Sequence, residues 1–314
     1  MPIVADSSKI ALSKHADASS TANAVDRLSS LLERFRVHAH LFHHGPLCGV
    51  TTFAAEPGRA FLHVLRRGEM LVSHRTRSGA PRKLQVSQPS LLFYPRPLYH
   101  AFHNAPEEGS DLVCATLSFD GGAQHPLVLA LPPVVVVPVD AVESIGKTLD
   151  LLFAETDKVR CGQRLLADRL FEVLLLQMLR WMLDHGPEVG VDSGLLAGLS
   201  SPKLARALTA LHDRPGDAWP LERLAAVAGM SRSAFAAEFK DAVGVTPGEY
   251  LVRWRVSVAQ TQLRSGFPVK AVSDELGYAS PAAFSRAFTK VAGVSPMQWV
   301  RSIAPTTPLV KVPK

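Results

Sequence analysis

The chain has 314 residues, of which 47% are hydrophobic and 20% charged, with three cysteines. This composition excludes a disordered tract and a disulfide-stabilised scaffold, and it favours a globular protein of two domains in a reducing cytoplasm. The net charge of +6 is unevenly divided: residues 201–314 hold 15 Lys and Arg against 8 Asp and Glu, whereas residues 1–200 hold 19 against 20. Basic charge concentrated in one third of the chain indicates a surface that faces phosphate groups.

The N-terminal residues 1–25 are rich in Ser and Ala and lack the continuous apolar segment of a signal peptide, so we expect a disordered tail. The most apolar run, residues 126–139, is short and is interrupted by Pro132 and Pro133. A helix that spans a bilayer needs about 20 apolar residues. We therefore expect no membrane partner.

Residues 26–140 consist of short apolar runs separated by Gly and Pro. This spacing predicts many short strands that form a sandwich or a barrel. Within the region, QPSLLFYPRPLYHAFHN is similar to the second conserved motif of the cupin family, with Pro95, His100 and Asn104 in place and prolines where the motif has two glycines. The resemblance implies a cupin-like barrel.

The first cupin motif carries two histidines and a glutamate that bind a divalent metal. Here only His63 stands at the histidine pair, Leu65 replaces the second histidine, and Glu69 is the candidate carboxylate. We expect no required cofactor and no metal-dependent catalysis. A divalent metal held by His63 and His100, together with Cys114 or His103, is one interpretation, and packing or a small-ligand pocket is the other. The histidines of HAHLFHH, residues 38–44, are predicted at a solvated strand edge.

Cys114 lies in an alternating apolar stretch, DLVCATLSF. One interpretation is a buried small hydrophobe, and the other is a redox-sensing thiol with Cys48 as a candidate partner, which needs exposure and a lowered pKa. The stretch from Asp111 to Pro133 also resembles the cupin-like sensor of one branch of AraC-family regulators, some of which respond to oxidants. The resemblance implies that residues 26–140 sense a small ligand or an oxidant, with His63, His100 and Cys114 as candidate residues.

Residues 141–186 contain two helical runs, and the second carries apolar side chains around much of its surface. Such a helix is too apolar to pack on one side only, which favours a homodimer contact. The alternative is that the barrel covers both sides. The apolar positions are Leu165, Leu166, Leu170, Val173, Leu174, Met178, Trp181 and Met182. Residues 187–202, which are rich in Gly and Ser, are predicted to form a linker.

A repeat occupies the C-terminal third, where GMSRSAFAAEFKDAVGVTPGEY at 229–250 is followed by GYASPAAFSRAFTKVAGVSPMQW at 277–299. Each copy follows an amphipathic helix and begins with a turn glycine. A serine then caps a second helix with two phenylalanines four residues apart on its apolar face. Each copy therefore predicts a helix-turn-helix motif.

A single helix is predicted between the two copies, at about residues 247–264. At about 1.5 Å per residue it is roughly 27 Å long. A spacer of this length can hold two recognition helices in successive major grooves, which lie about 34 Å apart on one face of B-DNA. The alternative is a helical bundle with duplicated packing, but it does not explain why the positive charge is segregated.

From about Lys203 to Arg301 the chain resembles the DNA-binding domain of AraC/XylS-family transcription regulators, with the signature in VSDELGYASPAAFSRAFTKVAGVSPMQWVR. The resemblance implies a DNA-binding domain at 203–304 and a flexible tail at 305–314. It also implies promoter DNA and RNA polymerase as partners, with activation as the usual direction.

By this resemblance the recognition helices lie at about 231–240 and 281–290, and the positions at the bases are Ser233, Ala236, Ala237, Ala282, Ala283 and Arg286, with Ser285 beside them. Alanine offers only contact with a thymine methyl group, so Arg286 is the best candidate to read a guanine. Arg232 can read a base or contact phosphate. The residues expected at phosphates or in helix-surface pairs are Lys240, Arg255 and Lys290.

The sequence therefore predicts an α+β multidomain, cytoplasmic, non-enzymatic regulator of transcription. A cupin-like barrel with a helical dimerisation segment precedes an all-α double helix-turn-helix domain. One competing hypothesis is a cupin-type metalloenzyme with an accessory DNA-binding domain, which would need stoichiometric metal. Another is an architectural DNA binder, which would show little sequence preference.

Overall fold

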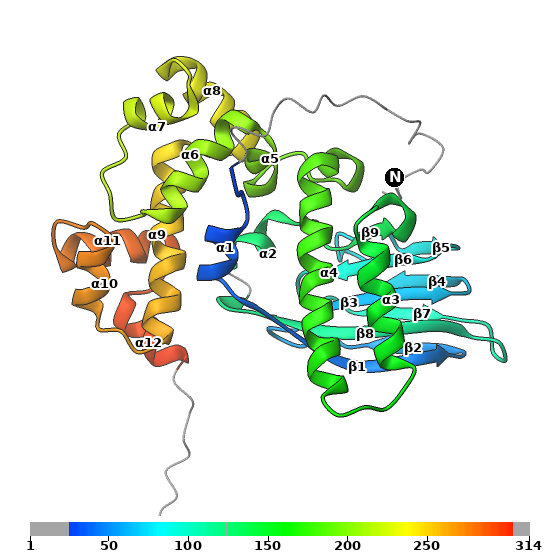
Figure 1. Cartoon of the computed structure of the whole chain (residues 1–314). Helices are drawn as coiled ribbons and strands as arrows, with labels where there is room; N and C mark the ends of the chain where they lie inside the picture. Colours follow the sequence, from blue (N-terminus) through cyan, green and yellow to red (C-terminus); the bar gives the residue numbers. More distant parts are fainter. Residues whose placement is uncertain (1–24, 123–124, 304–314) are drawn as a thin grey trace, which may run out of the picture.

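The computed structural model describes residues 25–122 and 125–303, which form a sheet-rich domain and a helical domain (Figure 1). The predicted α+β multidomain class is confirmed. The predicted tails at 1–25 and 305–314 lie outside the described residues, apart from Val25. Among the described helices, none is both long and apolar enough to cross a bilayer.

Two antiparallel sheets form the predicted barrel. One has the strand order β1 (Val37–Leu47), β8 (Ser110–Phe119), β3 (Ala60–Arg67), β6 (Ser90–Tyr94), β9 (Val135–Pro138). The other has the order β2 (Val50–Phe53), β7 (His100–His103), β4 (Met70–His74), β5 (Lys83–Val86).

The five-stranded sheet is buried on both faces, which explains its continuous apolar runs. One face packs inside the barrel through Phe61, Leu65 and Cys114, whereas Leu62 and Val64 belong to a second core on the outer face. Helices α3 (Ile145–Thr156) and α4 (Gln163–His185) lie on this outer side (Figure 1).

Helix α4 is apolar on more than one side, but only part of its surface is covered. It packs against β1 and α3, and Leu174, Met178 and Met182 are fully buried there. Leu165, Leu166 and Val173 are exposed. The barrel therefore leaves an apolar strip of α4 open.

Residues 187–202 were expected to be a linker, and this prediction is wrong. The segment contains most of the 3₁₀ helix η5 (Gly186–Val189) and all of helix α5 (Leu195–Ser200). Leu195, Leu196 and Leu199 are buried, and α5 contacts α4, α6 and α8. The Gly and Ser content suggested a linker, but the apolar residues of GLLAGL form a helix that joins the two domains.

The helical domain contains α6 (Pro202–Asp213), α7 (Leu221–Ala228), α8 (Arg232–Val243), α9 (Pro247–Arg264), α10 (Val269–Glu275), α11 (Pro281–Ala292) and α12 (Pro296–Ile303). The predicted local signals are confirmed: the hydroxyls of Ser231 and Ser280 cap α8 and α11. Gly229 and Gly277 adopt φ values of 68° and 72° at the two turns, a conformation that glycine adopts without strain.

Two short helices of the sheet-rich domain face the helical domain. Helix α1 (Ser29–Arg34) contacts α6, and α2 (Pro126–Ala130) contacts α5. The ring of Phe35 meets the ring of Trp254 edge-on at 5.2 Å between centroids. Figure 1 shows α1 between the barrel and α9. One hydrophobic core therefore continues from the sheet-rich domain into the helical domain.

Candidate nucleic-acid interface and barrel interior

The first helix-turn-helix presents α8 as its recognition helix. Phe235 and Phe239 anchor one face of α8 in the core. Ser233 and Ala237 are exposed on the opposite face, with Ala236 half-buried at its edge. Lys240 is also exposed. The face that carries the predicted base positions therefore consists of small side chains and is open to solvent.

Arg232, at the start of α8, is held by the neighbouring helix. Its guanidinium donates to the Glu222 carboxylate of α7 at 2.6 Å, and both side chains are more than half exposed. Hydrogen bonding from Arg232 lowers the pKa of Glu222 from its ordinary value. Only Nη1 of Arg232 meets Glu222, so its other N–H donors stay open to a base or a phosphate.

The second helix-turn-helix presents α11 in the same way. Phe284 and Phe288 are fully buried, and Arg286, Ala282 and Lys290 are exposed on the opposite face. The set is completed by the half-buried Ala283 and Ser285. Within the described part of the chain, Arg286 and Lys290 form no ion pair, so both cations are available to a polyanion.

Arg255 of α9 faces the protein, unlike the other predicted phosphate contacts. It donates to the carbonyl oxygens of Pro215 and Asp217, at 2.7 and 2.9 Å, and its guanidinium lies 5.4 Å from the Tyr278 ring centroid. Burial lowers the pKa of Arg255. These contacts assign Arg255 a structural role, and contact with phosphate stays an untested prediction.

A close backbone contact joins the α6–α7 loop to the second turn, and sequence reasoning missed it. A Cβ atom at Gly216 would clash with the carbonyl oxygen of Glu275, and one at Gly277 would clash with the carbonyl oxygen of Gly216. Arg255 holds the same loop. Together these contacts set the orientation of the two helix-turn-helix units. The only sequence signal was a pair of glycines far apart in the chain.

The barrel interior brings His63 and His100 together, as the cupin motifs predict. Their Nε2 atoms lie 3.0 Å apart. His100 Nδ1 donates to the carbonyl oxygen of Leu98, so the lone pair on His100 Nε2 accepts the proton of His63 Nε2. Burial lowers the pKa of His100 to about 4 and that of His63 well below its ordinary value. Both imidazoles are therefore neutral at pH 7.

The residues around this pair do not complete a metal site. Leu65 fills the position of the second motif histidine inside the barrel, and Glu69 is exposed in the turn after β3, so its prediction as a ligand is wrong. His103 instead pairs with the hydroxyl of Ser73 at 2.8 Å. Among the described residues, no group of three or more His, Cys, Asp or Glu could hold a metal. Aromatic rings surround the pair: Phe42, Phe53, Phe61, Tyr94 and Phe102.

Cys114 lies opposite His63 in the β3–β8 ladder and is completely buried. Burial raises the pKa of its thiol far above the ordinary range. A redox sensor needs an accessible thiol with a lowered pKa, so both observations oppose the redox interpretation. Cys48 and Cys161 are exposed, and all three cysteines are free.

The histidines of residues 38–44 lie on β1, an edge strand that pairs only with β8 in its sheet. His38 and His44 are exposed, as predicted for a solvated edge. A register shift between Leu41 and His43 breaks the alternation that would align the four side chains.

The chain matches the family described as Cupin over residues 26–184 and the family described as Helix-turn-helix domain over residues 224–302. A putative AraC-like transcription regulator of Streptomyces antibioticus is 40% identical over 194 residues, which cover 60% of this chain and 63% of that protein. The chain belongs to the AraC family of transcription regulators. The Escherichia coli K12 protein named RCS-specific HTH-type transcriptional activator RclR is 28% identical over 224 residues, covering 69% of this chain and 78% of its own length.

Two of the solved structures that are similar to this chain cover different shares of it. The DNA-binding domain of AdpA in complex with a target DNA is 28% identical, with a TM-score of 0.30, over 31% of this chain and 89% of that chain. ToxT from Vibrio cholerae is 11% identical, with a TM-score of 0.38, over 85% of this chain and 98% of its own.

Proposed function

We propose that this AraC-family regulator binds promoter DNA sequence-specifically through both helix-turn-helix units, under the control of its cupin-like domain. The observation that carries the proposal is the pair of exposed recognition helices, α8 and α11, joined by the single helix α9. The basic excess of residues 201–314 supports the proposal, because it concentrates positive charge in the part of the chain that carries both recognition helices.

The test is selection of genomic DNA fragments by the purified full-length chain, followed by sequencing. A shared motif with paired half-sites about one helical turn apart is the expected result. Affinity should also fall steeply with salt, because contacts with about 6–10 phosphates release bound counterions. Enrichment of fragments without a common motif would favour an architectural DNA binder instead.

We further propose that the protein acts as a homodimer through α4. Support comes from three apolar side chains on its open strip, Leu165, Leu166 and Val173, which are 62%, 49% and 42% exposed. The double variant Leu165→Glu/Leu166→Glu should sediment as a monomer in analytical ultracentrifugation. Val50→Glu is the matched control, because Val50 is 63% exposed on β2, away from α4. A dimer that survives the double variant contradicts this interface.

Activation, with RNA polymerase as a partner in the cytoplasm, is the proposed outcome of promoter binding. A relative that carries the word activator in its name supports this direction. We propose a small organic ligand as the signal, because Cys114 lacks the exposure of a sensor thiol. We propose no metal, because among the described residues no third His, Cys, Asp or Glu joins His63 and His100 in a group that could hold one. Transcription from a selected promoter, with and without the chain, tests the direction.

A further inference from the structure

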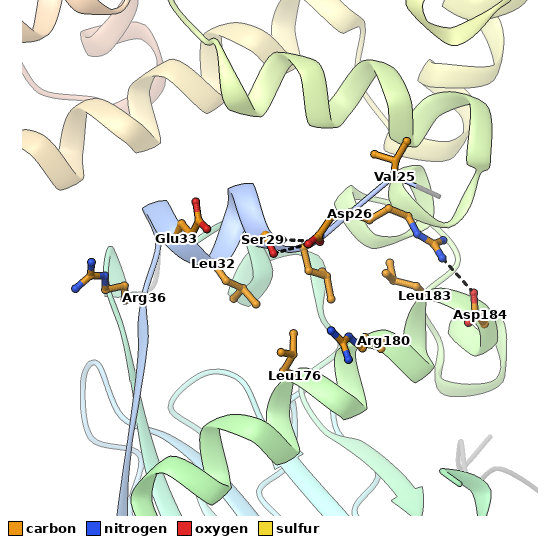
Figure 2. Close-up of a pocket in the computed structure, with 12 residues that line it drawn as sticks. Val25, Asp26, Ser29, Leu32, Glu33, Arg36, Leu176, Arg180, Leu183 and Asp184 are labelled. Carbon is orange, nitrogen blue, oxygen red and sulfur yellow. Dashed lines mark hydrogen bonds and ion pairs between the residues drawn. The ribbon is translucent and has the colours of Figure 1, made fainter. Parts of the chain in front are cut away.

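A groove lies outside the barrel, where α1 meets α4 (Figure 2). It has a volume of about 680 Å³ and is lined by α1 with its flanking residues and by the second half of α4. A second hollow of about 330 Å³ shares Leu32, Arg36 and Leu176 with it and extends the groove toward β1. The combined space is large enough for an organic molecule of effector size.

The floor of the groove is apolar. Leu32 of α1 and Leu176 of α4 point into the same space in Figure 2, and Leu183 lies farther along α4. Leu179 continues the apolar lining in the second hollow. Leu179 and Leu183 are already buried, whereas Leu32 and Leu176 are half-buried and can cover the hydrocarbon body of a ligand, with a gain proportional to the area removed from water.

Most of the charges around this floor already have partners. Asp26 accepts from the backbone N–H groups of Leu28 and Ser29 and from the Ser29 hydroxyl. Arg27 lies 3.7 Å from the carboxylate of Asp184.

Two other arginines of the groove, Arg36 and Arg180, form no ion pair among the described residues. Both are exposed, and they lie toward opposite ends of the groove in Figure 2. Among the described residues, Glu33 is the one groove carboxylate that forms no hydrogen bond or ion pair. Arg180 lies near enough to Asp26 to lower the pKa of that carboxyl, whereas Arg36 lines both hollows beside Leu32 and Leu176. A cation beside an apolar floor is complementary to an anion that carries an apolar body.

Helix α1 separates this groove from the helical domain. The α1 side chains that line the groove are Ser29, Leu32 and Glu33. Its other face carries Leu31, which is fully buried, and Arg34, which donates to the carbonyl oxygen of Asp213 at the end of α6. A ligand in the groove would therefore press on the helix that docks the DNA-binding domain.

We propose that the groove between α1 and α4 is a binding site for a small amphipathic organic anion, with Arg36, which lines both hollows, at the acidic group and Leu32 and Leu176 against the apolar body. Binding is independent of the proposed DNA function. The interpretation of the groove as the effector site rests on that function, because α1 would transmit ligand binding to α6.

The probe for the experiment is 1-anilinonaphthalene-8-sulfonate, which joins a sulfonate to an apolar ring system and fluoresces when it leaves water. N-phenyl-1-naphthylamine, which has the same rings without the charge, is the neutral comparison. Arg36→Gln should weaken binding of the sulfonate by about tenfold or more, as expected for a lost charge-assisted contact. Arg180→Gln should weaken it by less, because Arg180 lies toward the other end of the groove, and both variants should leave binding of the neutral probe unchanged. Arg164→Gln is the matched control on α4 outside the groove.

Leu176→Trp should fill the groove and abolish binding of both probes at this site. Equal sulfonate affinity in all four variants, or equal affinity of the native chain for the charged and neutral probes, would overturn the proposal. Hydrogen exchange reports the coupling: the sulfonate should change the protection of α1 and α6 amides but not those of α11. Loss of probe binding in the arginine variants together with normal DNA-fragment selection would support the groove. Normal probe binding without fragment enrichment would contradict only the DNA function.

Discussion

The two helix-turn-helix units share one repeated pattern but differ in their surroundings. Helix α8 is tied to the segment that joins the domains: Gly194 N–H donates to the carbonyl oxygen of Ala242, and the Ser201 hydroxyl donates to the Glu238 carboxylate. Helix α11 packs on α9, α10 and α12, all within the helical domain.

The two recognition helices, α8 and α11, also differ in net charge. Helix α8 balances Arg232 and Lys240 with two acidic residues, whereas α11 carries Arg286 and Lys290 without an acidic residue. Two copies of one motif can therefore differ in what they contact and in the charge that they carry. The first unit is tied to the segment that joins the domains, and the second carries the greater net positive charge.

The largest expected effect comes from Phe35→Ala. Phe35 is 1% exposed against Trp254, and removal of a buried phenylalanine costs about 3–5 kcal/mol. Hydrogen exchange should rise in α6 and α8 and stay near its native rate in α11. Phe42→Ala, at a position 43% exposed on β1, is the control with little effect. Equal loss of protection in α8 and α11 would contradict the claim that only the first unit depends on the contact between the domains.

The next effect is the pH dependence of stability that His212 of α6 adds to that of the buried barrel histidines. Burial lowers the pKa of His212 from 6.5 to about 3, and its Nε2 lies 2.7 Å from the Tyr250 hydroxyl. Between these pKa values the unfolded chain binds the extra proton, so this stability is complete above pH 6.5 and is lost as the pH falls. One such histidine accounts for about 3 kcal/mol between pH 7 and pH 4.

Denaturant unfolding at several pH values measures this loss. His212→Gln should reduce the change in the free energy of unfolding between pH 7 and pH 4 by the contribution of one histidine. His38→Gln, at an exposed position, should leave it unchanged. An unchanged slope in His212→Gln would show that other groups carry the acid sensitivity.

Substitutions in α11 should separate base readout from phosphate contact. Arg286→Ala should cost about 1–3 kcal/mol of binding free energy on selected sequences only, and Lys290→Ala should weaken binding to all sequences and reduce the salt slope by about one. Fluorescence anisotropy with selected and scrambled duplexes measures both. Equal losses for Arg286→Ala on both duplexes would make Arg286 a phosphate contact.

The smallest effect is expected from Glu222→Gln, which releases Arg232 from its ion pair. Because exposed ion pairs are weak, DNA affinity should rise by less than about threefold, with a steeper salt dependence. The double variant Glu222→Gln/Arg232→Gln should lose this gain. A gain that persists in the double variant would mean that Glu222 itself repels DNA.

Local signals predicted the helical domain well. The Ser231 and Ser280 caps and the turn glycines act within a few residues of themselves, so their spacing is visible in the chain. The His63–His100 pair was also visible, because each residue belongs to a motif.

Contacts between distant segments were not visible in the same way. The docking of Phe35 on Trp254, the folding of Leu195–Ser200 and the hold of Arg255 on the α6–α7 loop all depend on tertiary packing. The barrel histidines also show that motif spacing alone can suggest a ligand that the fold does not bring to the site. Spacing allowed Glu69 as a ligand, but the turn after β3 directs that residue to solvent.

The core that runs without a break from Phe35 through Trp254 to Phe239 has a genetic consequence. An allele that damages α1 should have the phenotype of a defect in DNA binding, although α1 belongs to the sheet-rich domain. Its second-site suppressors should then fall in α6 and α9, where the docking surface can be rebuilt, and seldom in the barrel. Mutant phenotypes in this regulator would therefore map onto shared packing surfaces and not onto the two domains.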